Sequence, residues 1–370
     1  MKKKLVIILL YMGTAAGILA GCGSGGRNGQ TSNTVNAGGG EGETAMNSIR
    51  VTPTEEIQEL EKGLSVVRYE GNYGFDEFLD RGGADSDERV AEFLMESLSE
   101  SGLNLLFGEN PFGCSTLSAA GSDGGYLFGR NFDWNTCEGL IVSAKPEQGY
   151  ASVSTVNMDF ITSGGVDLSK LPDHVQALVV MYAPLDGMNE QGLAVSVNMI
   201  QDSDSIEQST EKPDITTTTA VRLLLDQAAT VDEAVELLSQ YDLHASMGMM
   251  VHFALADAEG NSAAVEYIDN EMSVVETPVV TNFYLTEGGK YGIGTGQSHE
   301  RYEILTDTLK EKQTMTEQEV RDALDSVSKD NFNEYESTEW SIVMNQETKE
   351  LTYFHRENYG EGYTLSVSRD

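Results

Sequence analysis

From Ser115 onward, short runs of alternating or β-branched apolar residues are separated by turn-forming residues, which is typical of strands. The strands predicted from this pattern are 126–128, 140–143, 151–157, 177–182 and 193–198. A helical spacing of apolar residues follows in 216–229. A second helix is predicted to begin at Thr230, because Thr230 and Glu233 have the spacing of a capping box.

The last third of the chain has the same alternation of blocks. Strands are predicted at 251–256, 263–268 and 272–276, helices at 299–312 and 316–327, and closing strands at 340–344, 351–355 and 363–367. Strand blocks and helix blocks are thus segregated along the chain. This arrangement favours an α+β layered sandwich over a doubly wound parallel sheet.

The residues before Ser115 have a different pattern of apolar and charged positions. Residues 51–63 carry charged helix formers after Pro53, residues 64–69 form a short β-type run, and residues 86–101 have apolar side chains on one helical face. Because residues 49–113 are too few for a confident independent domain, we expect them to pack on a larger domain formed by residues 114–370.

The first residues resemble a bacterial lipoprotein signal. Three lysines precede the apolar run 5–12, and Leu19-Ala20-Gly21-Cys22 is the small-residue pattern that precedes a lipid-modified cysteine. The alternative, a lone transmembrane helix, is disfavoured because the run is short and glycine-rich for a bilayer core of about 30 Å. We therefore expect a signal peptide over 1–21, lipid on Cys22, and an extracytoplasmic protein anchored to the bacterial cell membrane. The glycine-rich residues after Cys22 predict a flexible linker over 22–48.

Composition narrows the possible partners. The chain has 370 residues, of which 60 are Asp or Glu and 23 are Lys or Arg, and its formal net charge is −37. Such a surface would repel nucleic acid, which we exclude as a partner. Hydrophobic residues make up 39% of the chain, enough for a sizeable core. Motifs for zinc proteases, P-loops and serine hydrolases of the Gly-x-Ser-x-Gly type are absent, so no metal or other cofactor is predicted.

Two histidines, His252 and His299, are possible functional residues. His252 stands in an apolar strand, where a satisfied core histidine is commoner than a ligand, and His299 stands close to Arg301, where it could line a site. Neither pattern predicts a function by itself.

Cysteines are more informative. Besides Cys22 the chain has Cys114 and Cys137, and outside the cytoplasm two thiols predict a structural disulfide. The alternative makes Cys114 a nucleophile. The glycine-rich turn 121–125 predicts a hairpin that returns Arg130 and Asp133 to the side of Cys114, where a guanidinium can lower the pKa of a thiol and a carboxylate can orient an amine.

The sequence has Cys114 and, further along, the motif Gly129-Arg130-Asn131-Phe132-Asp133. This pattern resembles that of the choloylglycine hydrolase family of N-terminal-nucleophile amide hydrolases. This family includes bile salt hydrolases and penicillin V acylases, and it is related to acyl-CoA:6-aminopenicillanate acyltransferase and acid ceramidase. The resemblance continues in family order over residues 114–367. Asn198 after the Asp186–Leu193 segment, Asn282 in a Thr-Asn pair, and Arg301 match later family positions.

The resemblance implies a four-layer αββα sandwich and self-cleavage before Cys114. It also implies hydrolysis of a linear, non-peptide amide. The freed α-amino group of Cys114 would serve as the general base, since its pKa of about 7.7–8 lies close to working pH. Arg130 would steady the thiolate, Asp133 would hold the amine, Asn198 would bind the oxyanion, and Asn282 would complete that site. Unlike many bacterial members, this chain has residues 23–113 between the predicted lipid anchor and the nucleophile.

Two classes of function follow. The first is a lipid-anchored amidase for a small N-acyl compound such as a conjugated bile salt, penicillin V, an acyl-homoserine lactone or an N-acyl amino acid, with an acyltransferase on the same scaffold as a variant. The second is a non-catalytic surface lipoprotein that binds a small molecule or partner, with Cys114 and Cys137 joined. The sequence favours the first, because motif order and spacing agree over a long stretch.

Overall fold

The computed structural model describes residues 46–98, 113–162, 168–330 and 336–367. The predicted signal peptide 1–21, Cys22 and most of the predicted linker 22–48 lie outside these residues. Within them, no helix is both long and apolar enough to cross a membrane.

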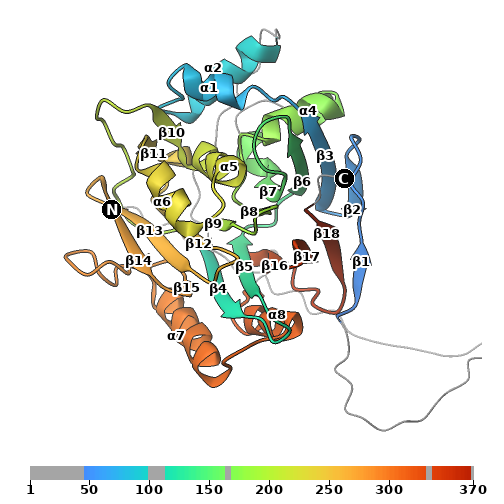
Figure 1. Ribbon diagram of the computed structural model, residues 1–370, viewed down its shortest axis with the longest axis vertical. Helices are drawn as coiled ribbons and strands as arrows, with labels where there is room; N and C mark the ends of the chain where they lie inside the picture. The colour runs from blue at the N-terminus through green and yellow to red at the C-terminus, as the bar shows by residue number, and fades with distance from the viewer. Residues whose placement is uncertain (1–45, 99–112, 163–167, 331–335, 368–370) are drawn as a thin grey trace, which may run out of the picture. The chain divides into compact units, whose positions relative to one another are not determined.

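Two large sheets form the centre of the fold (Figure 1). Sheet I has seven strands in the order β1-β18-β17-β16-β5-β4-β15, and sheet II has nine in the order β14-β13-β12-β9-β8-β7-β6-β3-β2. The strands of sheet I are Ser48–Arg50 (β1), Gly362–Ser366 (β18), Glu350–His355 (β17), Ser337–Asn345 (β16), Tyr126–Trp134 (β5), Gly113–Ala120 (β4) and Val279–Val280 (β15). The strands of sheet II are Glu271–Glu276 (β14), Ser262–Ile268 (β13), Val251–Ala256 (β12), Ala194–Met199 (β9), Asp186–Asn189 (β8), Ser152–Asn157 (β7), Gly139–Pro146 (β6), Leu64–Gly71 (β3) and Gln58–Glu61 (β2). Two short parallel strands, Asp214–Thr216 (β10) and Asp242–His244 (β11), form a separate pair.

Helices cover the outer face of each sheet. Helices α7 (Gly296–Glu311) and α8 (Glu317–Asp325) pack on β4, β5, β15 and β16 of sheet I. Helices α4 (Asp173–Val180), α5 (Thr217–Gln227) and α6 (Val231–Leu238) pack on strands of sheet II. The smaller helices are α1 (Phe75–Asp80), α2 (Asp87–Leu98) and α3 (Met158–Thr162), with single 3₁₀ turns at Leu168–Lys170 and Ser246–Gly248. The order of layers is therefore αββα, as predicted.

Alternation of side chains along β4 explains where the core lies. Cys114 belongs to the large apolar cluster between the sheets, whereas Leu117 belongs to a smaller cluster under α7 and α8 with Leu305, Val320 and Leu324. A strand buried on both faces has no solvent-facing side, and a polar group on it needs a partner inside the protein.

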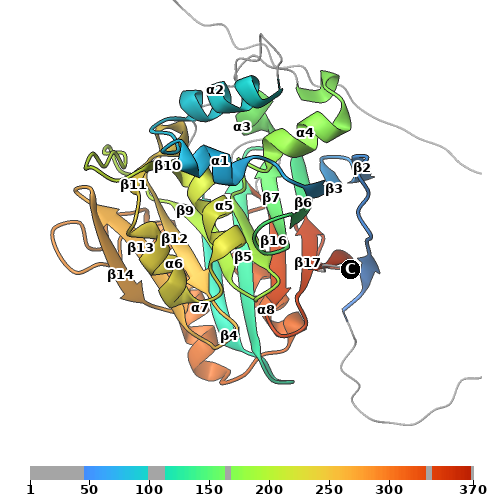
Figure 2. The same ribbon diagram turned by 45° about the horizontal axis from the view of Figure 1, so that its top comes forward.

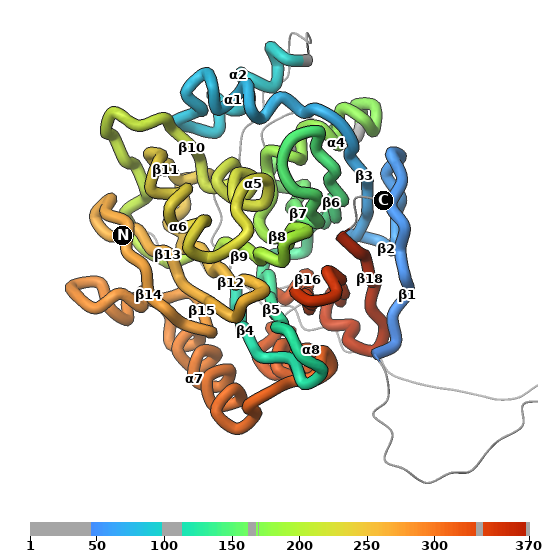
Figure 3. The backbone as a smooth tube through the Cα atoms, viewed as in Figure 1, coloured from blue at the N-terminus to red at the C-terminus, as the bar shows by residue number. Residues whose placement is uncertain are grey.

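The segment before Cys114 is built into both sheets. Strand β3 pairs with β6 over eight residue pairs, and β1 pairs with β18 near the C-terminus. In Figure 3, β1 and β18 run side by side. Helices α1, α2 and α4 lie at one end of the strands (Figure 2). Residues 45–370 form one compact unit, so the leading segment has no core of its own.

Two predicted elements are wrong. Residues 177–182 belong mostly to α4, because Pro172 and Asp173 begin a helix whose apolar residues are buried, and a short apolar run does not distinguish a buried helix from a strand. Residues 51–63 contain β2 and its turn to β3 instead of helix, because Gly63, at φ +94°, reverses the chain there.

Candidate active site

The β4–β5 hairpin positions Cys114 and Arg130. Its turn is closed by a hydrogen bond from the Gly121 N–H to the Gly125 carbonyl oxygen, 2.9 Å, and Gly124 and Gly125 both have positive φ. The antiparallel register pairs Thr116 with Arg130 and therefore places the Arg130 side chain on the same face as Cys114. The hairpin predicted from the sequence is present.

Arg130 is fully buried and only partly satisfied. Its Nε donates to Asp186 Oδ2 at 2.5 Å, and its Nη1 donates to the Asn131 carbonyl oxygen at 3.2 Å. Trp340 Nε1 donates to the same Asp186 oxygen at 3.0 Å and fixes that carboxylate. Arg130 Nη2 has no hydrogen-bond partner with ordinary geometry among the described residues. Arg130 also interacts with Cys114 through its charge and a side-chain hydrogen bond, so a buried cation lies beside the thiol.

Competing effects set the acidity of that thiol. Burial raises the pKa of Cys114, and the positive charges of Arg130 and Arg301 lower it, while Asp133 raises it again. Burial prevails in this uncut chain, so the pKa lies above the ordinary value and the sulfur keeps its proton at neutral pH.

The backbone nitrogen of Cys114 has an unusual partner. Strand β15 pairs with β4 only at Thr116 and Leu117, so on this side of β4 the ladder ends before Cys114. Instead, the Cys114 N–H donates to the side-chain Oδ1 of Asn282 at 2.8 Å. Asn282 is in turn fixed through its Nδ2, which donates to the Met199 carbonyl oxygen at 2.6 Å.

Arg301 connects Asn282 to Asp133. Its Nη2 donates to Asn282 Oδ1 at 2.7 Å, and its Nη1 donates to Asp133 Oδ2 at 2.7 Å. Although Arg301 lies on helix α7, only 4% of it is exposed. Thr338 donates to the other Asp133 oxygen at 2.7 Å, so both carboxylate oxygens are engaged. Asp133, which the family resemblance implied would hold the amine directly, reaches the Cys114 nitrogen through Arg301 and Asn282.

Asn198 lies in the same region but is already engaged. Its Nδ2 donates to the Val280 carbonyl oxygen at 3.1 Å, with the Thr281 carbonyl oxygen at 3.5 Å, and its Oδ1 accepts from Ser196 at 2.9 Å. In this form the amide braces the segment that leads to Asn282 and is not free to bind an oxyanion.

One neighbour of the site was not found from the sequence. A Cβ atom added to Gly113 would lie 2.6 Å from Lys329 Nζ and 3.0 Å from Asp133 Oδ2. Lys329 is buried, forms an ion pair with Glu336, and lies 3.9 Å from Asp133 Oδ2. No local motif marks Lys329, because only the folded chain brings it to the residue before Cys114.

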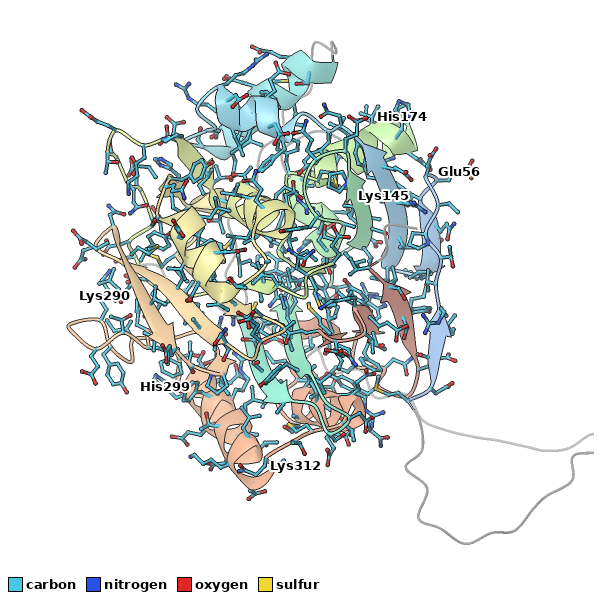
Figure 4. The ribbon with its side chains drawn as sticks, in the orientation of Figure 1. Glu56, Lys145, His174, Lys290, His299 and Lys312 are labelled. Atoms are coloured by element: carbon cyan, nitrogen blue, oxygen red, sulfur yellow. The ribbon has the colours of Figure 1, made fainter. Side chains whose placement is uncertain are left out.

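The other predicted groups, His299 and Cys137, have partners outside the Cys114 network. His299, labelled in Figure 4, stacks on Phe283 with ring centroids 4.0 Å apart, and its Nε2 contacts the Gly292 carbonyl oxygen. Cys137 is buried and free, as is Cys114, so the disulfide weighed from the sequence is not formed. Burial, with Glu339 nearby, raises the pKa of the Cys137 thiol well above its ordinary value.

Comparison with known proteins finds a family similarity over part of the chain and a shared fold. Residues 180–358 match the family of acyl-coenzyme A:6-aminopenicillanic acid acyl-transferase. A penicillin V acylase from Pectobacterium atrosepticum is 32% identical over 104 residues, which span 25% of this chain and 28% of the relative. A mutant of the conjugated bile acid hydrolase from Clostridium perfringens superposes with a TM-score of 0.52 at 18% identity, covering 70% of this chain and 93% of that one. A second variant of that hydrolase gives a TM-score of 0.51 at 17% identity, with the same coverage.

The predicted resemblance to the choloylglycine hydrolase and penicillin V acylase family is confirmed, and the fold is that of N-terminal-nucleophile hydrolases. The curated relative is matched over only 28% of its own length.

Proposed function

We propose that this chain is a hydrolase of linear amide bonds in small N-acyl compounds, and that Cys114 becomes its nucleophile after self-cleavage between Gly113 and Cys114. The main support is the hydrogen bond from the Cys114 nitrogen to Asn282, which Arg301 and Asp133 brace. Strand β15 does not extend to Cys114, and the Asn282 side chain takes the place of a strand partner there. Here, a fixed polar network surrounds the one nitrogen that the cut would convert into an amine.

Self-cleavage begins when the Cys114 sulfur, on losing its proton, attacks the Gly113 carbonyl carbon. The Gly113–Cys114 C–N bond breaks, the nitrogen takes up a proton, and a thioester forms. Water then hydrolyses the thioester to release a Gly113 carboxylate and the Cys114 thiol. The new α-amino group can accept the thiol proton in each later turnover, because its ordinary pKa lies close to neutrality.

Amide hydrolysis follows the same chemistry on a bound substrate. The Arg130 charge favours the thiolate, the thiolate attacks the acyl carbon, and the departing amine takes the proton from the Cys114 ammonium. Water completes the cycle by releasing the acid. Cys114 has no exposed surface in the uncut chain, so substrate access would follow the cut.

The experiment is an assay of the full chain against conjugated bile salts, penicillin V, acyl-homoserine lactones and N-acyl amino acids. Hydrolysis of at least one of these by wild type, lost by orders of magnitude in Cys114→Ser, supports the proposal, because a hydroxyl is far less ionised than a thiol. Arg130→Lys should also be harmful, since a point charge cannot replace a guanidinium that donates to Asp186 and to the Asn131 carbonyl oxygen at once. A folded wild type that hydrolyses none of the four classes would refute it.

An acyltransferase is the second candidate, favoured by the name of the family that residues 180–358 match. The thioester intermediate would then pass its acyl group to an amine instead of to water. Adding 6-aminopenicillanic acid to the assay separates the two, because a transferase would form an N-acyl product faster than the free acid.

We further propose that lipid on Cys22 anchors the enzyme outside the cytoplasm. The support is the sequence pattern before Cys22. The full chain should fractionate with membranes, and Cys22→Ala should not be lipid-modified. A wild type that carries no lipid would contradict this proposal and leave the amidase proposal untouched.

A further inference from the structure

His252 makes two hydrogen bonds in the core behind the candidate active site. This residue of β12 is fully buried; its Nδ1 lies 3.0 Å from Glu266 Oε1, and its Nε2 lies 2.7 Å from the Thr281 carbonyl oxygen. A backbone carbonyl only accepts hydrogen bonds, and so does an ionised carboxylate. The ring is therefore held at both nitrogens, with Nε2 donating to the Thr281 carbonyl oxygen.

Glu266, the partner on β13, is also fully buried and is ionised. Burial acts to raise the pKa of its carboxyl, but the hydrogen bond and charge of His252 and the hydrogen bonds from Thr286 and Leu285 outweigh it and lower the pKa to about 2. The Leu285 and Thr286 N–H groups each donate to a Glu266 oxygen at 2.8 Å. The pair His252 and Glu266 thus binds both ends of the segment 281–286.

This segment contains Asn282, the residue that binds the Cys114 nitrogen. A peptide unit is planar, so fixing the Thr281 carbonyl oxygen also fixes the direction in which the Asn282 backbone begins. His252 lies directly opposite Asn198 in the β9–β12 ladder, and Asn198 donates to the preceding carbonyl, that of Val280. Two neighbouring side chains of sheet II therefore brace two successive carbonyls just before Asn282.

From this geometry we infer that His252, oriented by Glu266, is a positioning residue of the amidase centre: it sets the Thr281 peptide and thereby the Asn282 oxygen that receives the Cys114 nitrogen. The inference rests on the proposed function and adds to it a residue that does not touch the reacting atoms. A misplacement of about 1 Å in such a group can cost on the order of 100-fold in rate.

A purely structural ion pair is the competing explanation, and the chain contains a comparison for it. His244 of β11 contacts Asp214 of β10 at 2.8 Å, in the small two-stranded sheet. Its contacts are not with the 281–286 segment. Loss of either pair should lower thermal stability, but only loss of the His252 contact with Thr281 should change catalysis.

The test compares His252→Asn with His252→Gln in the full chain. The Asn amide reaches about as far as Nδ1 and keeps the Glu266 contact, whereas the Gln amide reaches about as far as Nε2 and keeps the donor to Thr281. We expect kcat to fall at least about 10-fold in His252→Asn, with KM within twofold of wild type, and to stay within about threefold in His252→Gln. The control His244→Asn should lower Tm and leave kcat unchanged.

Glu266→Gln is the second variant, for the case in which His252→Asn does not fold. It keeps the shape and removes the carboxylate charge that faces the His252 ring, and its kcat should fall with KM unchanged. Equal kcat values in wild type and His252→Asn would overturn the inference and leave the proposed function intact. So would losses of kcat that are proportional to the loss of Tm in every variant, the His244→Asn control included. A wild type that is neither cut nor active would instead overturn both.

Discussion

Gly113 lies directly against Lys329: a single added methyl group would come within 2.6 Å of the Lys329 Nζ atom and 3.0 Å of Asp133 Oδ2. The Asp133 carboxylate cannot easily move away, because Arg301 and Thr338 donate hydrogen bonds to its two oxygens. The Lys329 side chain can shift at its end, so it is mainly the fixed Asp133 carboxylate that disfavours a side chain at the residue before the proposed cut.

Gly113→Ala should slow self-cleavage at least about 10-fold and cost about 1–3 kcal/mol of stability, because the neighbours must move apart to admit a Cβ atom. Gly289→Ala is the matched control, since nothing lies within 4 Å of a Cβ at that position. A time course on denaturing gels measures both. Equal cutting rates in Gly113→Ala and wild type would show that the contact with Lys329 and Asp133 does not constrain the reaction.

The leading segment should remain bound after the cut. Leu64, Val66, Val67 and Phe78 are at most 1% exposed, and β3 keeps its full ladder with β6. Arg356 adds a hydrogen bond to the Lys62 carbonyl oxygen at 3.3 Å. Because most of this interface is apolar, raised salt should not separate the fragments. Gel filtration in 1 M salt should give one peak containing both; a separate, active C-terminal fragment would contradict this.

The buried carboxyl of Asp87 should make the free energy of unfolding depend on pH. Burial raises the pKa of its carboxyl to about 6, although the Met247 N–H donates to it at 2.7 Å. The folded state therefore favours the protonated form. Its contribution to stability is full below about pH 4 and is lost as the pH rises through about 6.

Asp87→Asn should remove this loss and raise stability at pH 7.5 by about 1–3 kcal/mol. Denaturant unfolding of the uncut Cys114→Ala chain at several pH values measures it, with Asp85→Asn at an exposed neighbouring position as the control. Parallel pH profiles for Asp87→Asn and its parent would disprove the assignment.

Cys137 should be dispensable for catalysis. It lies in the connection from β5 to β6, where the Arg356 guanidinium donates to its carbonyl oxygen at 2.9 Å and Glu339 accepts from its N–H at 3.0 Å. Cys137→Ala keeps both backbone contacts, so kcat should stay within about twofold. Comparable losses of folding in Cys137→Ala and Cys114→Ser, with no amide turned over, would instead contradict the assignment of Cys114 as the nucleophile.

Local signals in the sequence predicted the elements whose causes are local. The hairpin around Cys114 follows from five turn residues and a two-residue periodicity, and the helix after Thr230 begins where the Thr230 side chain accepts from the Glu233 N–H. Segregated blocks of strands and helices predicted an α+β layered sandwich, and the family resemblance added the αββα order of the layers. Cys114, Arg130, Asn282 and Arg301 were identified together through spacing and family order, and the fold brings them together.

The remainder depends on contacts between distant parts of the chain. Lys329 lies 216 positions beyond Gly113 and has no motif around it. His252 looked like an ordinary core histidine because its partners, Glu266 and Thr281, are set by strand register and by the path of the chain after β15. Residues 177–182 look apolar whether they form a strand or a helix, and only the packing of α4 against sheet II decides between the two.

The central claim is that Cys114 becomes the first residue of a chain. Intact mass and N-terminal sequencing of the purified full chain, after reduction, test it most directly. We predict that wild type yields a fragment of residues 114–370 that begins with Cys114, and that Cys114→Ala yields one uncut chain. A wild type that stays uncut at Gly113–Cys114 and still hydrolyses N-acyl amides would contradict the account.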